Sequence, residues 1–171
     1  MRAFIAVEVE SEKLKEIQKQ FEITGVKLTN HFHITLKFFK EISDEAIEEV
    51  KRRLNDVKFD SFDLEINGLG TYPGGNYVRV IWVSVKSAEI YELQKEIDNK
   101  LADLFPRDTK FSSHITLGRV KFVTDKQLLL DRIKSTRVEP DKFKVKEFKL
   151  VKSVLEEEGP VYEDLAKFEL R

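Results

Sequence analysis

The sequence predicts an α+β fold of two pseudo-symmetric lobes, each a mixed or antiparallel sheet with flanking helices, around a central cleft. The tetrapeptide His-Ile-Thr-Leu begins at positions 33 and 114, and each copy lies within a succession of strand, helix, motif strand, helix and strand. Similar segments at a fixed offset are typical of duplicated architecture. No low-complexity linker interrupts the chain. We therefore expect one bilobal domain over residues 1–171, with approximate lobe halves at 1–74 and 75–171.

The first half is predicted to begin with a strand and then to alternate helices and strands. Residues 2–9 alternate and are rich in Phe, Ile and Val, which favours a strand. Ser11 and Ser43 are expected N-caps of two helices, because apolar residues at helical spacing follow each of them. Further strands are expected at residues 31–39 and 59–69. The apolar helix positions are Leu14, Ile17 and Phe21 in the first helix and Ile47, Val50 and Leu54 in the second.

The second half repeats this order of elements. The segment "TYPGGN" at 71–76 predicts a chain reversal, and "YVRVIWVSV" at 77–85 is the strongest strand signal in the sequence. The second motif strand begins at position 114, and residues 142–155 and 160–170 predict an antiparallel hairpin. Two helices are expected between these strands. One is capped by Ser87 and carries Ile90, Leu93, Ile97, Leu101 and Leu104, and one opens with a capping box of Thr124 and Gln127 before Leu128 and Leu129.

Composition excludes several classes of protein. With 41% hydrophobic and 36% charged residues the chain can bury a core and is not disordered. The absence of cysteine excludes a disulfide framework, a thiolate nucleophile and cysteine-ligated zinc. No apolar run approaches the roughly 20 residues of a membrane span, and the N-terminal "MRAFIAVEVE" lacks the features of a signal peptide. We expect a cytoplasmic monomer without a membrane partner.

The net charge of −1 bears on the kind of substrate. Such a chain has no global field that would attract nucleic acid, so an anionic substrate must be held by a local cluster of donors. The balance excludes a histone-like binder and leaves RNA enzymes open.

Alternation along a strand places the motif residues on two faces. Successive side chains of a strand point to opposite sides, so His33 and Thr35 share one face while Ile34 and Leu36 can face the core. If the lobes pack symmetrically, His114 and Thr116 are presented in the same way. A cleft between the lobes would then receive two imidazoles and two hydroxyls.

This set of side chains suits acid–base chemistry at a phosphodiester. Histidine alone has an unperturbed pKa near neutrality, so one imidazole can accept a proton while the other donates one. Threonine hydroxyls can donate to the non-bridging oxygens of the phosphate in the transition state. Two alternatives stay open, a hydrogen-bonded structural role for each histidine and a non-functional duplicate. A metal site is not expected, because two imidazoles without a third ligand are a poor zinc set.

The paired motifs resemble the 2H phosphoesterase superfamily, named for two His-x-Thr/Ser motifs. The resemblance is closest to its LigT/ThpR-like branch of RNA 2′,3′-cyclic phosphodiesterases, also called 2′-5′ RNA ligases. It covers nearly the whole chain, through "MRAFIAVEV", "HITLKFF", "YVRVIW", "HITLGRVK" and "GPVYEDLAKFEL". It implies hydrolysis of a 2′,3′-cyclic phosphate to a 2′-phosphomonoester without metal or cofactor. It also implies, for some members, reversible joining of RNA ends through a 2′-5′ linkage.

The resemblance also implies roles for individual residues. His33 and His114 would be the acid–base pair, and Thr35 and Thr116 the catalytic donors to the phosphate. We start from His33 as acid and His114 as base, although the near-symmetry of the motifs leaves both assignments open. Arg119 would contact the substrate.

Two side chains near the first motif are ambiguous. Phe38 would be a stacking surface for a base, yet alternation from His33 points it to the opposite face, where it would be a core residue. The same alternation gives Lys37 the face of His33.

Two positions depart from the family pattern, and two rival functions remain. His31 stands where the family usually has asparagine and could join the same face, and Lys40 replaces an expected glycine. One rival is a cyclic phosphodiesterase for a small nucleotide, which substrate length would distinguish. The other is a non-catalytic module that binds RNA ends or nucleotides. Binding alone has less need of two groups that titrate near neutrality.

Overall fold

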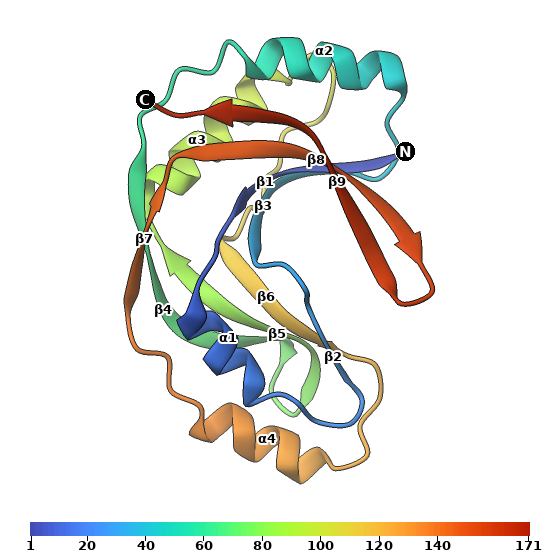
Figure 1. The fold of residues 1–171 in the computed structure, drawn as a ribbon, viewed down its shortest axis with the longest axis vertical. Helices are drawn as coiled ribbons and strands as arrows, with labels where there is room; N and C mark the ends of the chain where they lie inside the picture. The colour runs from blue at the N-terminus through green and yellow to red at the C-terminus, as the bar shows by residue number, and fades with distance from the viewer.

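The computed structural model describes residues 1–171 as two curled antiparallel sheets with four helices (Figure 1). One sheet has the strand order β3-β1-β8-β9 and the other β2-β6-β5-β4-β7. The elements are β1 (Arg2–Glu8), α1 (Glu12–Lys19), β2 (Val26–Leu28), β3 (His33–Phe39), α2 (Asp44–Leu54), β4 (Phe62–Gly74), β5 (Tyr77–Lys86), α3 (Ala88–Lys100), β6 (His114–Val120), α4 (Lys126–Ser135), β7 (Asp141–Val145), β8 (Glu147–Glu156) and β9 (Gly159–Glu169). The predicted α+β class is confirmed.

The two sheets exchange strands between the halves of the sequence. The motif strand β3 pairs with β1, and β6 pairs with β5. The strand that ends the first half, β4, pairs with β5, and its counterpart β8 pairs with β1. Each sheet therefore contains strands from residues 1–74 and from 75–171, so neither sheet is built from one half of the sequence alone.

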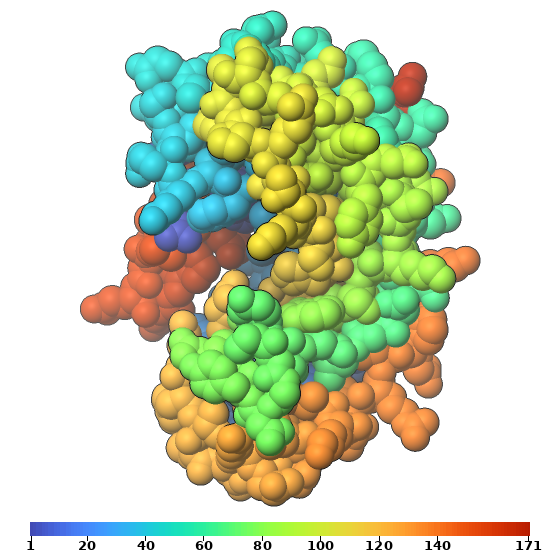
Figure 2. Space-filling model, turned by 180° about the vertical axis from the view of Figure 1, so that it is seen from behind, coloured from blue at the N-terminus to red at the C-terminus, as the bar shows by residue number.

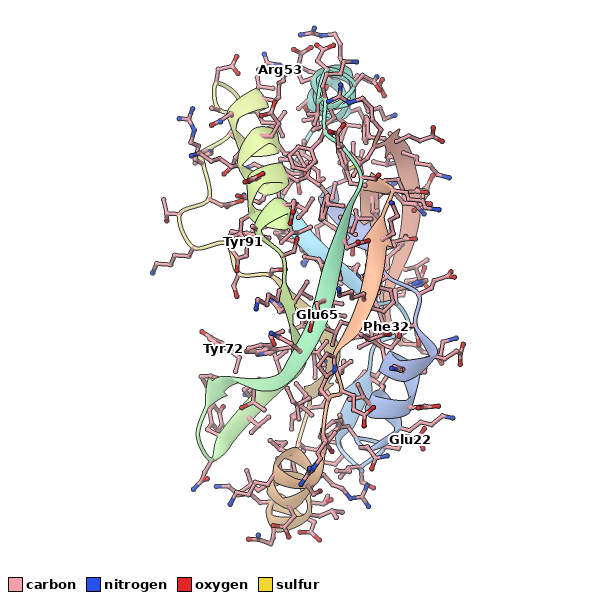
Figure 3. All side chains as sticks on the ribbon, turned by 90° about the vertical axis from the view of Figure 1, so that its left-hand side faces the viewer. Glu22, Phe32, Arg53, Glu65, Tyr72 and Tyr91 are labelled. Atoms are coloured by element: carbon pink, nitrogen blue, oxygen red, sulfur yellow. The ribbon has the colours of Figure 1, made fainter.

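The helices cover the outer faces and join the same core. Figure 2 shows α3 and the loop after it (yellow-green to yellow) over the upper part of the back of the molecule, above the tip of the β4–β5 hairpin (green). Arg53, at the end of α2, donates to the carbonyl of Lys100 at the end of α3 over 3.2 Å, where these two helices meet (Figure 3). Both sheets and all four helices contribute to one core cluster of 34 buried residues. None of the helices has the length and apolar character of a membrane span.

Most element boundaries agree with the sequence pattern, and the N-caps Ser11, Ser43 and Ser87 are confirmed by side chains that accept a backbone N–H. The cap of α4 is Asp125 and not Thr124, since its carboxylate accepts the N–H of Leu128 over 3.0 Å. Both residue types cap helices well, so the pattern could not separate neighbours.

Three strands differ from the prediction. The expected strand 142–155 is two strands, since the chain changes sheets at Lys146 and β7 pairs with β4 while β8 pairs with β1. The apolar alternation continues through this point, and only the pairing partner changes. Strand β4 extends to Gly74, so the reversal is narrower than the predicted 71–76. Strand β2 was not expected, because three residues carry too little pattern.

A β-bulge interrupts both motif strands at the same place. In β3 Thr35 pairs with Ala6 and Lys37 with Ile5, so Leu36 is the extra residue. In β6 Thr116 pairs with Trp82 and Gly118 with Ile81, so the position of Leu117 is bulged in the same way. A bulge adds one residue to one strand and shifts the alternation of the residues that follow. The two strands accordingly share one burial pattern, residue for residue.

The bulge overturns the face predicted for two residues. Lys37 was expected on the face of His33, but its side chain is buried. Phe38 was expected on the opposite face, but it is 48% exposed. The alternation argument was wrong for both because it assumed an uninterrupted strand.

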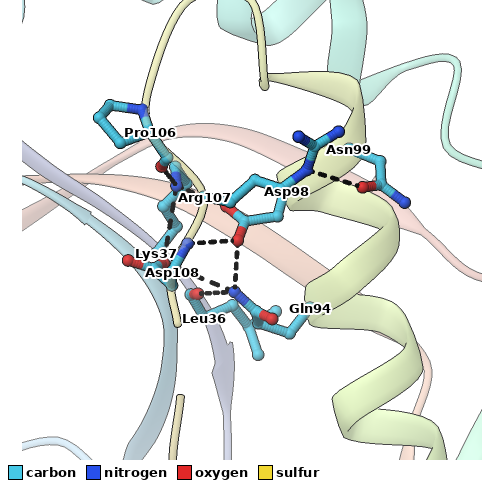
Figure 4. Close-up of polar contacts among 8 residues, drawn as sticks. All are labelled: Leu36, Lys37, Gln94, Asp98, Asn99, Pro106, Arg107 and Asp108. Carbon is cyan, nitrogen blue, oxygen red and sulfur yellow. Dashed lines mark hydrogen bonds and ion pairs between the residues drawn. The ribbon is translucent and has the colours of Figure 1, made fainter. Parts of the chain in front are cut away.

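Lys37 is neutralised inside the protein by α3 and the loop after it (Figure 4). Its Nζ lies 2.5 Å from Oδ1 of Asp98 and donates to the carbonyl of Pro106 over 2.9 Å. The other oxygen of Asp98 accepts the backbone N–H of Asp108 over 2.7 Å and a longer bond from Gln94. Lys37 and Asp98 are 4% exposed. The network therefore ties the bulged strand to α3 by charges that water does not screen.

We predict that Lys37→Met lowers the free energy of unfolding by about 3–5 kcal/mol, because it leaves the carboxylate of Asp98 buried without its cation. The double variant Lys37→Met/Asp98→Asn should recover part of this loss, since no uncompensated charge remains. Urea denaturation of both variants measures the difference. A single variant as stable as the wild type would contradict the buried pair.

Candidate active site

The two motif strands bring their histidines and threonines to one cavity. His33 and Thr35 from β3 and His114 and Thr116 from β6 line a cavity of about 560 Å³. All four side chains are half-buried. Arg119 lines the same cavity, because the bulge in β6 gives it the parity of His114 and Thr116. Five of the six predicted site residues therefore meet at one place.

Glutamines from the helices hold the two bulges. A bulge leaves backbone groups outside the regular ladder, and these need other partners. Gln94 of α3 donates to the carbonyl of Leu36 over 3.4 Å, and Gln18 of α1 donates to the carbonyl of Leu117 over 2.9 Å. Each helix belongs to the other half of the sequence from the strand that it supports. The geometry of each motif therefore depends on both halves.

His33 lies in an aromatic environment. Its ring stacks on Phe4 with centroids 5.1 Å apart, and Tyr162 meets it edge-on at 5.8 Å. Burial lowers the pKa of His33 from 6.5 to about 4, and the charge of His31 lowers it further, against an opposing effect of Glu8. The imidazole of His33 is therefore neutral at neutral pH and can accept a proton.

His114 is oriented by a backbone carbonyl. Its Nδ1 lies 3.0 Å from the carbonyl oxygen of Ser112. A carbonyl only accepts, so Nδ1 carries the hydrogen and donates it, which leaves Nε2 as the nitrogen that can exchange a proton. The ring also lies beside Trp82, with centroids 5.8 Å apart. The two histidines share a sequence motif and differ in their surroundings.

The remaining predicted residues offer free donors near the histidines, with one exception. No protein group accepts a hydrogen bond from the hydroxyls of Thr35 and Thr116, and Arg119 forms no ion pair. These groups can donate to a phosphate. Phe38 does not line the cavity; it lies on the cleft face outside it, with the guanidinium of Arg2 5.2 Å from its ring centroid.

Sequence reasoning did not assign several residues that line the cavity. Tyr162 of β9 lies 5.4 Å from the ring of His31. Tyr162 is in a segment that resembles the family, but no spacing tied it to the motifs. His31 joins the cavity, as alternation allowed. The cavity also has cationic and acidic edges, formed by Lys27 and Lys121 and by the hairpin residues Glu156, Glu157 and Glu158. No group of three or more potential ligand side chains is arranged for a metal ion.

Comparisons with known proteins agree with this arrangement. The family model for LigT-like phosphoesterases matches the chain in two consecutive segments, residues 5–82 and 83–162. The chain is 37% identical to the RNA 2′,3′-cyclic phosphodiesterase of Methanocaldococcus jannaschii, over 95% of this chain and 97% of that protein. It is 35% identical to the enzyme of the same name from Archaeoglobus fulgidus, over 99% and 100%. The crystal structure of TT0787 of Thermus thermophilus superimposes with a TM-score of 0.85 at 27% identity, covering 100% of this chain and 98% of that one.

A duplicated α+β fold with two His-Ile-Thr-Leu strands at one cleft defines the class of 2H phosphoesterases. The family match extends over both halves of the chain. The chain belongs to the LigT-like phosphoesterase family. The expected family is confirmed, and so is the expectation of a phosphodiesterase enzyme, because relatives over almost the full length carry that enzyme name.

We predict that His33 titrates near pH 4, and that His31→Gln moves its pKa upward because a positive neighbour is removed. NMR titration of the histidine ring protons measures both values. An unfolded chain takes up this proton near pH 6.5, before the folded protein does, so the stability contributed by His33 falls as the pH drops from 6.5 towards 4. His33→Gln should weaken this dependence. A wild-type His33 that titrates near 6.5 would contradict the buried environment.

Proposed function

We propose that the protein hydrolyses RNA 2′,3′-cyclic phosphate ends to 2′-phosphomonoesters by acid–base catalysis with His33 and His114. The observation that carries this proposal is the meeting of two imidazoles and two unengaged threonine hydroxyls at one cavity. The name shared by the relatives supports a cyclic phosphate on RNA as the substrate. The cavity volume is within the range of sites that enclose a small ligand.

The environments of the histidines favour a division of roles that reverses our starting assignment. His33 is neutral, so it suits the base that removes a proton from water as the water oxygen attacks phosphorus. The bond from phosphorus to O3′ breaks, and His114 donates a proton from Nε2 to O3′. The product keeps its phosphate on O2′. His33 ends protonated and His114 neutral, and exchange of one proton with solvent at each site restores the starting state.

The donors around the cavity stabilise the charge that develops on the phosphate. The hydroxyls of Thr35 and Thr116 point to the cavity from both sides, and Arg119 adds a cation that no carboxylate neutralises. Preorganised donors of this kind act without reorganising during the reaction. Each of the three can donate to a non-bridging oxygen while the histidines handle the water and O3′.

End-joining follows from the same steps with a different nucleophile. If the 5′-hydroxyl of a second RNA takes the place of water, His33 removes its proton and the same bond to O3′ breaks. The product then carries a 2′-5′ linkage. The step runs in either direction without a nucleotide cofactor, because the energy of the cyclic ester is retained in the new diester.

A small nucleotide cyclic phosphate and a non-catalytic nucleotide-binding role remain the rival functions. The free donors would serve either. A low pKa at one of two facing histidines favours catalysis over binding alone, because it separates a base from its partner. One domain over residues 1–171, a monomeric state and a cytoplasmic location stay predictions.

We predict that EDTA-treated protein opens a short RNA that ends in a 2′,3′-cyclic phosphate and leaves a 2′-phosphate. His33→Ala and His114→Ala should each lower kcat by about 10²–10⁴-fold, the usual contribution of a general acid or base. Chromatography against 2′- and 3′-phosphate standards identifies the product. Thermal unfolding of the variants controls for loss of structure. Full activity in both folded variants would overturn the mechanism.

We predict that a substrate with sulfur in place of O3′ distinguishes the acid from the base. A thiol has a pKa of about 8.5, so the thiolate leaves without protonation. His114→Ala should therefore regain most of its lost rate on this substrate, while His33→Ala stays slow because water must still be activated. Single-turnover rates on the two substrates give the comparison. Recovery by His33→Ala alone would restore our starting assignment.

A further inference from the structure

The cleft face of the four-stranded sheet continues beyond the cavity at the beginning of β1. Alternate residues of β1 point to this face, where Phe4 and Ala6 pack with Val151 and Tyr162 in a small cluster separate from the main core. Arg2 has the same parity as Phe4. Its guanidinium lies over the ring of Phe38, which the bulge of β3 has turned to this face.

Arg2 is a cation without an anionic partner. It forms no ion pair, and its Nε is buried with no protein group to accept its hydrogen. The other large cation of this face, Lys149, is held at 2.9 Å by both Glu8 and Asp164. A guanidinium kept partly desolvated without a carboxylate costs free energy. Such a group is suited to an anion that arrives from outside.

The position of Arg2 connects it to the cavity. Burial raises the pKa of the Tyr162 hydroxyl, and the charges of Arg119 and Arg2 both oppose that rise. Tyr162 lines the cavity, so its hydroxyl lies within the electrostatic influence of both arginines. Along β3, Phe38 follows Thr35 by three residues, which is roughly 10 Å at the rise of a strand. This distance is too long for the reacting phosphate and suits the neighbouring nucleotide.

A structural explanation accounts for part of these observations. The stem of Arg2 could simply cover an apolar ring, as long cationic side chains often do. It does not explain why Phe38 remains 48% exposed beside the cleft, or why no acceptor meets the buried Nε. An arginine face and an aromatic face together are the groups that proteins use for single-stranded nucleic acid.

We propose that Arg2 and Phe38 form a second subsite, in which Arg2 holds the phosphate that links the terminal nucleotide to its neighbour and Phe38 stacks on the neighbour's base. This inference rests on the proposed function and extends it. It makes the preferred substrate an RNA end of at least two nucleotides. A cyclic mononucleotide fills the cavity alone and leaves the subsite empty.

The test compares kcat/KM for a 2′,3′-cyclic mononucleotide and for a trinucleotide that ends in the same nucleotide. We expect Arg2→Gln and Phe38→Leu each to lower the ratio of trinucleotide to mononucleotide kcat/KM by about tenfold, within the range of one base stack. The matched control is Arg137→Gln, which removes the same charge beside a separate groove. Its ratio should equal that of the wild type.

Salt dependence separates the two groups. Loss of one phosphate contact should reduce the slope of log kcat/KM against log salt by about 0.7 for a single strand. Arg2→Gln should show this change on the trinucleotide and Phe38→Leu should not. A ratio that stays at the wild-type value in both variants, or an equal loss on both substrates, would overturn the subsite. Wild-type protein that turns over neither substrate would instead overturn the proposed function.

Discussion

One extra residue in each motif strand decides what the cleft contains. The bulges at Leu36 and Leu117 leave the His-x-Thr pairs on the cleft face and then return the position two residues after the bulge to that same face. Arg119 thereby joins His114 and Thr116, and Phe38 becomes exposed, while Lys37 enters the interior. An uninterrupted strand would instead turn Arg119 towards the core, where a guanidinium is costly without a partner. The glutamine bonds and the Lys37–Asp98 pair hold this local geometry.

Identical motifs acquire different properties from what packs around them. Phe4 and Tyr162 shield His33 from water, whereas the carbonyl of Ser112 fixes the tautomer of His114. An acid–base pair needs one member that holds a proton and one that does not. Duplication alone would supply two equal groups. The asymmetry arises outside the motifs, mainly from the C-terminal strand that carries Tyr162, which has no equivalent aromatic beside His114 other than Trp82.

The sequence was sufficient to predict the duplication, the α+β class and the faces of His33, Thr35, His114 and Thr116, because these depend on repetition and on short-range alternation. Alternation failed after Leu36, since a bulge adds a residue without any signal in composition. It also failed at Lys146, where the strand continues but its partner changes. The contacts of Arg2, Tyr162 and Lys37 join segments far apart in the chain, and no local pattern encodes such pairings.

The exchange of β4 and β8 between the sheets has a consequence for folding and for motion. Neither half of the sequence can complete its own sheet, so each depends on a strand that the other half provides. Many pairings are therefore of long range, and such topologies fold slowly and as one cooperative unit. The same interlock limits how the molecule can breathe. Opening the cleft as a clamshell would bend the connections that carry these strands across, so adjustment to a ligand is left to side chains and to the β8–β9 hairpin.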